Sequence, residues 1–95
     1  MSAMKTNLEP DAIPYFSWDR RLTVRQITDL LRTKSGVEQY RLAAWIMREA
    51  VFDDVWKFLQ PRWVRDHFDE LAPLLGRKRE FWKYILGMWH ELGKL

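Results

Sequence analysis

The sequence predicts an all-α fold, a compact bundle of about five short helices with an irregular, aromatic N-terminal arm. Two observations favour helices. Thr23 stands three residues before Gln26 and Ser35 three residues before Glu38, and apolar residues recur at helical spacing in the stretches that follow. A third observation argues against a sheet, because no stretch shows the alternation of apolar and polar residues typical of a half-buried strand.

Length and composition limit the kinds of protein that this chain can be. With 95 residues it suffices for one domain, and we expect a flexible tail over residues 1–13 and a single helical domain over residues 14–95. The absence of cysteine excludes disulfides and thiolate metal sites. No run is typical of a signal peptide or a membrane span, so we expect a cytoplasmic protein without membrane contact.

Three aromatic residues, Tyr15, Phe16 and Trp18, precede the first predicted helix. We expect Trp18 to pack inward, because it lies close to the start of that helix. Tyr15 and Phe16 are expected to form an arm that crosses a neighbouring surface. That surface belongs to the chain's own last helix, to a second copy or to another protein, and the first alternative is slightly favoured.

The first helix should begin after Thr23 and end near Thr33. Thr23 and Gln26 have the spacing of a capping box, in which each side chain bonds the backbone N–H of the other residue. Leu22 and Ile27 occupy the positions of a hydrophobic staple on either side of this cap.

A second capping box, formed by Ser35 and Glu38, predicts the next helix start. A helix that is apolar on two sides is packed by neighbours all round, so we expect this one at the centre of the bundle. One side carries Leu42 and Ile46, and the other carries the stripe Val37, Tyr40, Ala44, Met47 and Val51.

Two shorter helices should follow. One begins at Asp53 or Asp54 and ends near Gln60, because the residue before a proline avoids helical backbone. Pro61 suits the first position of the next helix, in which Val64, His67, Phe68 and Leu71 share one face.

Pro73 and Gly76 separate these helices from the last one, which Gly93 can terminate. This last helix carries two adjacent apolar stripes, which are Phe81, Ile85, Met88 and Leu92 on one side and Trp82, Leu86 and Trp89 beside it.

Residues suited to catalysis are few. Neither His67 nor His90 has acidic residues at metal-ligand spacing, and we expect His67 at the edge of the core and His90 in solvent. Asp53 and Asp54 stand at a helix start, where stabilisation of the helix dipole explains them better than a catalytic pair does. The sequence also lacks a glycine-rich phosphate loop. We therefore predict no enzymatic activity, no cofactor and no bound metal.

Arginine-rich stretches are the main candidates for binding. Arg77, Lys78 and Arg79 stand at the start of the last helix, where cations oppose the helix dipole. They fit either a solvated turn or a docking patch for phosphates or acidic side chains.

The second helix carries Arg41, Trp45, Arg48 and Phe52 in one row. Either the two aromatic side chains pack on a neighbouring helix while the arginines extend past them, or this row is a binding face. The candidate partner-binding residues are thus Tyr15, Phe16, Arg41, Trp45, Arg48, Arg77, Lys78 and Arg79.

A DNA-reading helix-turn-helix is a weaker alternative. A recognition helix needs exposed Arg, Lys, Asn or Gln near its N-terminus. The helix that starts at Pro61 offers Arg62 and Arg65, but Asp66 and Asp69 follow closely and would repel phosphates.

The segment YFSWD, residues 15–19, and the later Asp53, Asp54 and Trp56 are similar to motifs of a known group of small helical proteins. Its members begin near (Y/F)-F-x-W-D and carry (E/D)-D-x-W in the middle of the chain. Their genes often lie just upstream of nucleotidyltransferase-fold toxins of the AbiEii (abortive infection) type. The resemblance covers about Tyr15 to Leu92 and implies an antitoxin or an accessory subunit of the toxin. The group offers no catalytic residues to transfer.

From this resemblance we predict a non-enzymatic, antitoxin-like protein that binds and neutralises a nucleotidyltransferase-type toxin. A net charge of +3, with six Trp and five Phe, fits a protein that uses arginine and aromatic side chains at an interface. The main alternative is a small nucleic-acid-binding or transcription-regulating domain. A third is a helical module that forms a homodimer through its aromatic surfaces.

Overall fold

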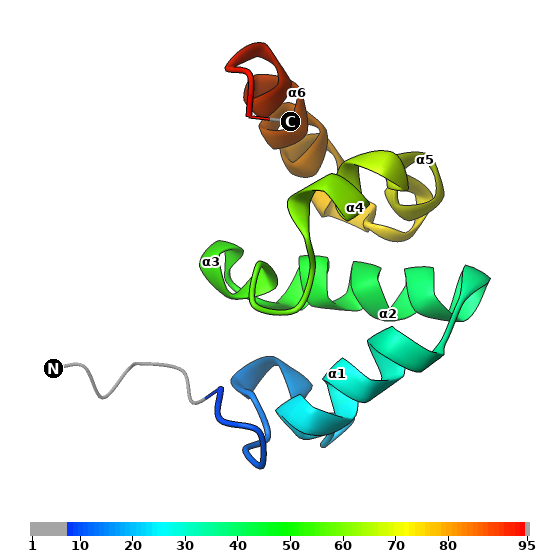
Figure 1. Cartoon of the computed structure of the whole chain (residues 1–95), viewed down its shortest axis with the longest axis vertical. Helices are drawn as coiled ribbons and strands as arrows, with labels where there is room; N and C mark the ends of the chain where they lie inside the picture. The colour runs from blue at the N-terminus through cyan, green and yellow to red at the C-terminus, as the bar shows by residue number, and fades with distance from the viewer. Residues whose placement is uncertain (1–7, 95) are drawn as a thin grey trace, which may run out of the picture.

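Helix α2 (Gly36–Glu49) runs through the centre of the protein, and the other helices pack around it (Figure 1). The computed structural model describes residues 8–94. Over that range the protein is all-α, as predicted, and no strand is present. Every residue from Leu42 to Met47 is buried, which confirms the central position expected from the apolar residues on both sides of this helix.

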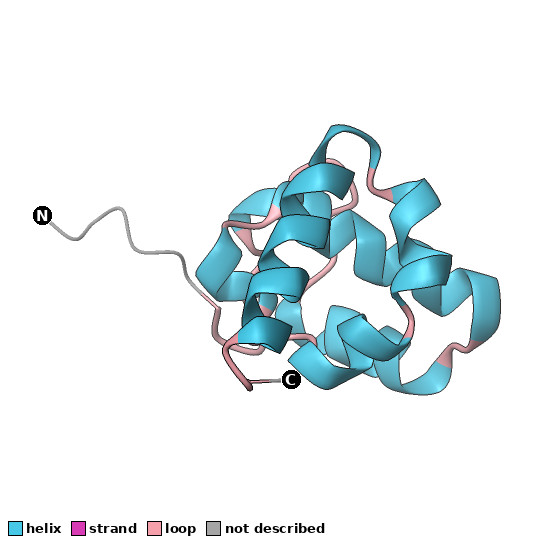
Figure 2. Ribbon diagram, turned by 90° about the horizontal axis from the view of Figure 1, so that it is seen from above, coloured by secondary structure: helices cyan, strands magenta, loops and turns pink. Residues whose placement is uncertain are grey.

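The other helices lie on two sides of α2 in Figure 1, with α1 below it and α4 and α5 above it, and α6 lies farthest from α1. Short loops join them (Figure 2). In chain order the elements besides α2 are η2 (Tyr15–Ser17), α1 (Val24–Thr33), α3 (Phe52–Val55), α4 (Pro61–Asp66), α5 (Phe68–Leu71), η3 (Ala72–Leu74), η4 (Gly76–Lys78) and α6 (Arg79–Glu91).

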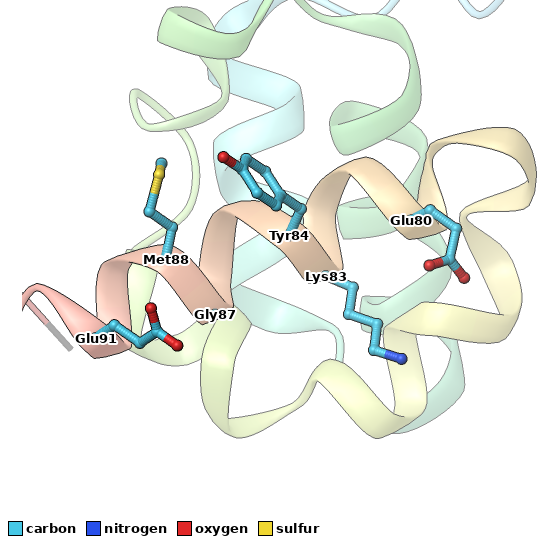
Figure 3. A pocket seen from close by; sticks show the side chains of 6 residues that line it. All are labelled: Glu80, Lys83, Tyr84, Gly87, Met88 and Glu91. Atoms are coloured by element: carbon cyan, nitrogen blue, oxygen red, sulfur yellow. The ribbon is translucent and has the colours of Figure 1, made fainter.

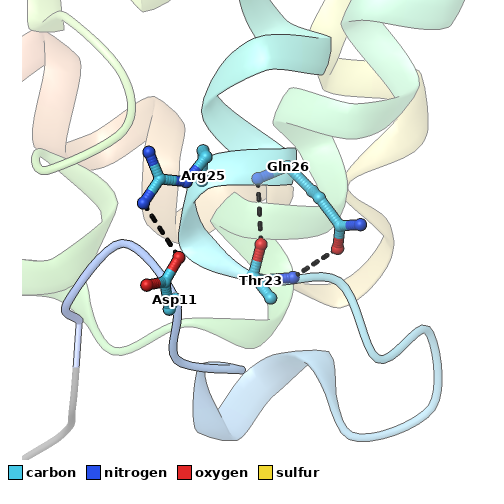
Figure 4. Close-up of polar contacts among 4 residues, drawn as sticks. All are labelled: Asp11, Thr23, Arg25 and Gln26. Atoms are coloured by element: carbon cyan, nitrogen blue, oxygen red, sulfur yellow. Dashed lines mark hydrogen bonds and ion pairs between the residues drawn. The ribbon is translucent and has the colours of Figure 1, made fainter.

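The start of α1 confirms the first predicted capping box (Figure 4). The Gln26 N–H donates to Thr23 Oγ1 at 3.1 Å, and the Thr23 N–H donates to Gln26 Oε1 at 2.8 Å. Beside this box, Arg25 Nη2 lies 2.8 Å from Asp11 Oδ1. The capping box marks where α1 begins, and the exposed ion pair adds a contact between α1 and the segment before it.

The remaining free N–H groups of α1 bind the segment that precedes it. The Val24 N–H donates to the Ala12 carbonyl and the Arg25 N–H to the Pro10 carbonyl, each at 2.9 Å. The later part of the predicted tail is therefore hydrogen-bonded to the start of α1. The first seven residues of that tail lie outside the described part of the chain.

The second predicted capping box, Ser35 with Glu38, is wrong. Ser35 precedes α2, but its side chain forms no capping hydrogen bond. Gly36 has left-handed backbone, with φ of 63°, and this changes the direction in which the chain enters the helix. Glu38 instead lies 3.7 Å from the ammonium group of Lys34.

The aromatic segment before α1 packs in the opposite way to the prediction. Phe16, expected in an arm, is 4% exposed and contacts the rings of Trp45 and Phe58 edge-on, with centroids 5.3 and 5.7 Å apart. Trp18, expected inside, is 75% exposed. The tight turn of η2 brings residue 16 to the core and leaves residue 18 on the surface, which local sequence spacing did not indicate.

Tyr15 connects η2 to α3 by hydrogen bonds. The sequence had favoured a contact with the last helix instead. Its hydroxyl donates to Asp54 Oδ2 at 2.9 Å and accepts the Val51 N–H at 2.7 Å. Desolvation by burial is the main cause that raises the pKa of Tyr15, and the buried Asp54 carboxylate raises this pKa further. The Asp54 carboxylate therefore has a structural role, as the acceptor of the Tyr15 hydroxyl.

The single helix predicted to start at Pro61 is divided into α4 and α5. Pro61 occupies the first position of α4, as expected. At His67 the backbone leaves the helical region, with φ of −114° and ψ of 18°. His67 Nδ1 donates to the Trp63 carbonyl at 2.9 Å, and its ring stacks on that of Trp63. His67 thus has the boundary position predicted for it.

Helix α6 is attached to α2 through the second of its two predicted stripes. Trp82 is buried, and its indole N–H donates to the Met47 carbonyl at 3.1 Å. In the first stripe, Phe81 and Leu92 are exposed. At the other end, Gly93 has φ of 77° and terminates the helix, as predicted.

The opposite exposures of Phe16 and Trp18 give a direct test of this packing. We expect Phe16→Ala to lower the free energy of unfolding by about 3–5 kcal/mol, because it empties a packed core position. Trp18→Ala should change it by less than about 0.5 kcal/mol, because the side chain is solvated. Urea denaturation of both variants measures this, and equal losses would contradict the described packing.

The bonds of Tyr15 predict a change of stability with pH. The raised pKa means that the folded protein keeps a proton which the unfolded chain loses near its ordinary pKa of 10.0. The contribution of the Tyr15 proton to the free energy of unfolding is fully present below about pH 10. It disappears as the pH rises through the pKa that Tyr15 has in the folded protein. We expect the free energy of unfolding to fall above about pH 10, and to fall less steeply in Tyr15→Phe.

Denaturant titrations of the wild type and Tyr15→Phe at several pH values above neutrality measure this slope. Tyr84→Phe, which removes an exposed hydroxyl, is the matched control and should keep the wild-type slope. If Tyr15→Phe and the wild type lose stability in parallel, the proton of Tyr15 does not contribute in this way.

Candidate functional site

The predicted partner-binding residues separate into a structural group and an exposed group. Phe16 and Trp45 are both buried in the core, and Trp45 is further covered by the Arg20 guanidinium, 4.4 Å from its ring centroid. Of the two readings of the row on the second helix, packing against neighbours is therefore correct for Trp45. The alternative in which Phe16 and Trp45 contact a partner does not fit the burial of both side chains.

Arg48 and Tyr15 also stabilise the fold. Arg48 Nη1 donates to the Leu74 carbonyl at 2.7 Å and so connects α2 to η3. Its side chain is partly buried, while the Tyr15 hydroxyl is bound by Asp54 and Val51. These side chains have partners inside the protein, so they are poor candidates for a free binding surface.

Arg41 remains exposed, in a basic hollow between α1 and α2. This hollow has a volume of about 220 Å³. Glu38, on its rim, pairs with Lys34 and lowers the local positive charge. The lining residues are Arg20, Leu30, Lys34, Glu38, Arg41 and Leu42.

The three cations predicted at the start of the last helix are all exposed. Arg77 and Lys78 form no ion pair or hydrogen bond with another side chain in residues 8–94, and Arg79 Nε lies 3.6 Å from Glu80 Oε2. Arg77 and Lys78 line a hollow of about 370 Å³ together with Phe81, which is 45% exposed. We call Arg77, Lys78, Arg79 and Phe81 the basic surface.

Phe81 was not among the candidate residues, because the sequence placed it in one of two adjacent apolar stripes without showing which of them packs on the protein. A signal was present in the sequence, since Phe81 follows Arg77 by four residues and Lys78 by three. Residues at these spacings share one face of a helix. The position of Phe81 beside Arg77 and Lys78 could therefore be predicted once the stripe that contains Trp82 was assigned to the core.

The structure does not bring Arg41 and the basic surface together. Their hollows share no lining residue. One lies between α1 and α2 and the other at the start of α6, and Figure 1 shows α1 and α6 on opposite sides of α2. The exposed candidates thus form two separate sites.

Two further properties hold for residues 8–94. They contain no group of three or more His, Asp or Glu side chains placed to hold a metal ion. None of their helices combines the length and the apolar character needed to cross a bilayer.

Comparison of the chain with protein-family models, with curated proteins and with solved structures found no match.

Proposed function

We propose that this chain is a non-enzymatic, antitoxin-like cytoplasmic protein that binds a nucleotidyltransferase-type toxin through its basic surface. The observation that carries the proposal is the placement of Arg77 and Lys78, exposed and without side-chain partners in residues 8–94, around the exposed ring of Phe81. Such a surface fits an acidic protein patch, because guanidinium groups bind carboxylates in a fixed, two-pronged geometry.

Stability does not account for this cluster. The three cations are at the N-terminal end of α6, where the helix dipole favours negative charge. Only Glu80 in the first turn has the favourable sign. A binding role explains why residues that weaken the helix end are gathered there.

The proposed partner supplies the complementary charge. Nucleotidyltransferases hold their catalytic metal through carboxylates, so their clefts are acidic. Cations that cover such a cleft would exclude the metal or the nucleotide, and an adjacent exposed phenylalanine adds apolar contact area. Neutralisation by this route needs no catalytic residue in the antitoxin.

One alternative uses the same surface. A basic hollow beside an exposed aromatic ring also suits single-stranded nucleic acid, whose bases stack on rings while cations contact the phosphates. The two functions differ in their response to salt, which supplies a test below.

Neutralising the basic surface should abolish binding without unfolding the protein. We expect the affinity-tagged wild type, co-expressed with the product of the gene immediately downstream as the proposed toxin, to co-elute with it in size-exclusion chromatography. The triple variant Arg77→Gln, Lys78→Gln, Arg79→Gln should lose the complex, because two or more charge-assisted contacts disappear.

The matched control removes three exposed cations elsewhere. Arg32→Gln, Lys57→Gln and Arg62→Gln together change the net charge equally but leave the basic surface intact. This control should keep the complex. A complex that survives neutralisation of the basic surface, or that the control abolishes equally, would show that these residues do not form the interface. Separate elution of the wild type and a folded toxin would remove tight antitoxin binding altogether.

Salt distinguishes the protein partner from nucleic acid. Three phosphate contacts to a single strand predict a loss of affinity of roughly 20-fold between about 50 and 200 mM salt. An interface that includes apolar contact should weaken by only a few-fold over this range. Fluorescence anisotropy with a labelled oligonucleotide and with the toxin, on the same protein sample, measures both slopes. Tight, steeply salt-dependent binding to the oligonucleotide alone would favour the nucleic-acid function.

A further inference from the structure

Helix α6 has a second exposed face, which the basic surface does not use (Figure 3). Its inner side is attached through Trp82, while Tyr84 on the outer side is 66% exposed. A shallow hollow of about 430 Å³ follows this side of the helix. We call its lining residues the α6 outer face, and they are Glu80, Lys83, Tyr84, Gly87, Met88 and Glu91.

Gly87 lies in the middle of the α6 outer face, and nothing in residues 8–94 requires a glycine there. A Cβ atom added to Gly87 would have no neighbour within 4 Å, and its φ is not left-handed. Glycine lowers the stability of a helix interior relative to almost any other residue. What its missing side chain does allow is the close approach of another backbone to α6.

The side chains around Gly87 are arranged in two rows. Figure 3 shows Tyr84 and Met88 on one side of the helix and Lys83 and Glu91 on the other. Lys83 precedes Gly87 by four residues, and Glu91 follows it by four. Lys83 and Glu91 are both exposed, and neither forms an ion pair within residues 8–94. Glu80, the third charge of this face, lies 3.6 Å from Arg79. The two charges without an ion pair therefore have opposite signs on either side of Gly87.

This arrangement is complementary to itself. We propose that the α6 outer face binds the same face of a second copy, with the two helices antiparallel and their Gly87 residues at the crossing. A two-fold axis of this kind places the apolar row against the apolar row. It also places Lys83 of each copy opposite Glu91 of the other. A parallel pair would place Lys83 opposite Lys83, so the charges select the antiparallel arrangement.

The size of the face sets the strength of the dimer. Helix α6 has 13 residues and is therefore about 20 Å long. One helix face of that length is smaller than a standard interface of about 800 Å² per partner. We expect a weak dimer, with a dissociation constant on the order of 10–100 μM.

Sedimentation equilibrium of the full chain alone tests the proposal. Between about 5 μM and 1 mM the wild type should pass from monomer to dimer. Gly87→Gln should stay monomeric over this range, because its side chain separates the crossing helices. The same substitution should leave the monomer at least as resistant to denaturant as the wild type, because it replaces a helical glycine in open space. Loss of the dimer then cannot be attributed to unfolding.

A charge exchange tests the orientation. Lys83→Glu places like charges opposite each other twice in the dimer and should weaken it by about tenfold. Adding Glu91→Lys restores opposite charges and should return the dissociation constant to within about threefold of the wild type. Lys57 is also exposed but lies outside α6, and Lys57→Glu changes the net charge by the same amount as Lys83→Glu. This control should leave the dimer unaffected.

Three results would overturn the inference: a wild type that stays monomeric throughout the range, a dimer that survives Gly87→Gln, or a double charge exchange that fails to restore association. Because the chain is measured without its partner, each of these results leaves the binding proposed for the basic surface unaffected.

Discussion

Every helix end leaves backbone groups without partners inside the helix, and a chain built from short helices has many such ends in little space. Here, side chains from distant elements bind several of these groups. Trp82 of α6 donates to the Met47 carbonyl in the last turn of α2, and Gln39 of α2 donates to the Leu31 carbonyl near the end of α1. The Tyr15 hydroxyl accepts the N–H of Val51, which precedes α3. These bonds fix the positions of the helices, because each joins one helix end to another element.

The need to bind these backbone groups explains why some of the predicted binding residues have structural roles instead. Arg48 binds the Leu74 carbonyl and Tyr15 binds two groups around α3, so each side chain already has its partners. Arg77 and Lys78 lie where α6 continues directly from η4, and in residues 8–94 no helix end of another element binds their side chains. The free cations of the basic surface are thus those that the network of helix ends does not use.

The same distinction separates what the sequence could predict from what it could not. The Thr23 and Gln26 cap of α1 and the start of α4 at Pro61 depend on residues within one turn of each other, and both predictions were correct. The burial of Phe16 depends on the rings of Trp45 and Phe58, more than twenty residues away, and Trp18 is left on the surface by the turn of η2, so local spacing gave no guide to either. For the site, the basic cluster could be predicted, but its exposed Phe81 required knowing which stripe of α6 contacts α2.

Helix α6 carries three distinct surfaces because only one of its sides is committed to the core. Trp82 and Leu86 bind it to the body of the protein, the basic surface lies at its start, and Gly87 lies on the outer face. Gly87 follows Phe81 by six residues, which corresponds to about 9 Å along the axis. An antiparallel pair that crosses at Gly87 would therefore place the two basic surfaces at opposite ends of the paired helices. A weak dimer of this geometry would present both surfaces to partners at once, so self-association and partner binding would not compete for the same residues.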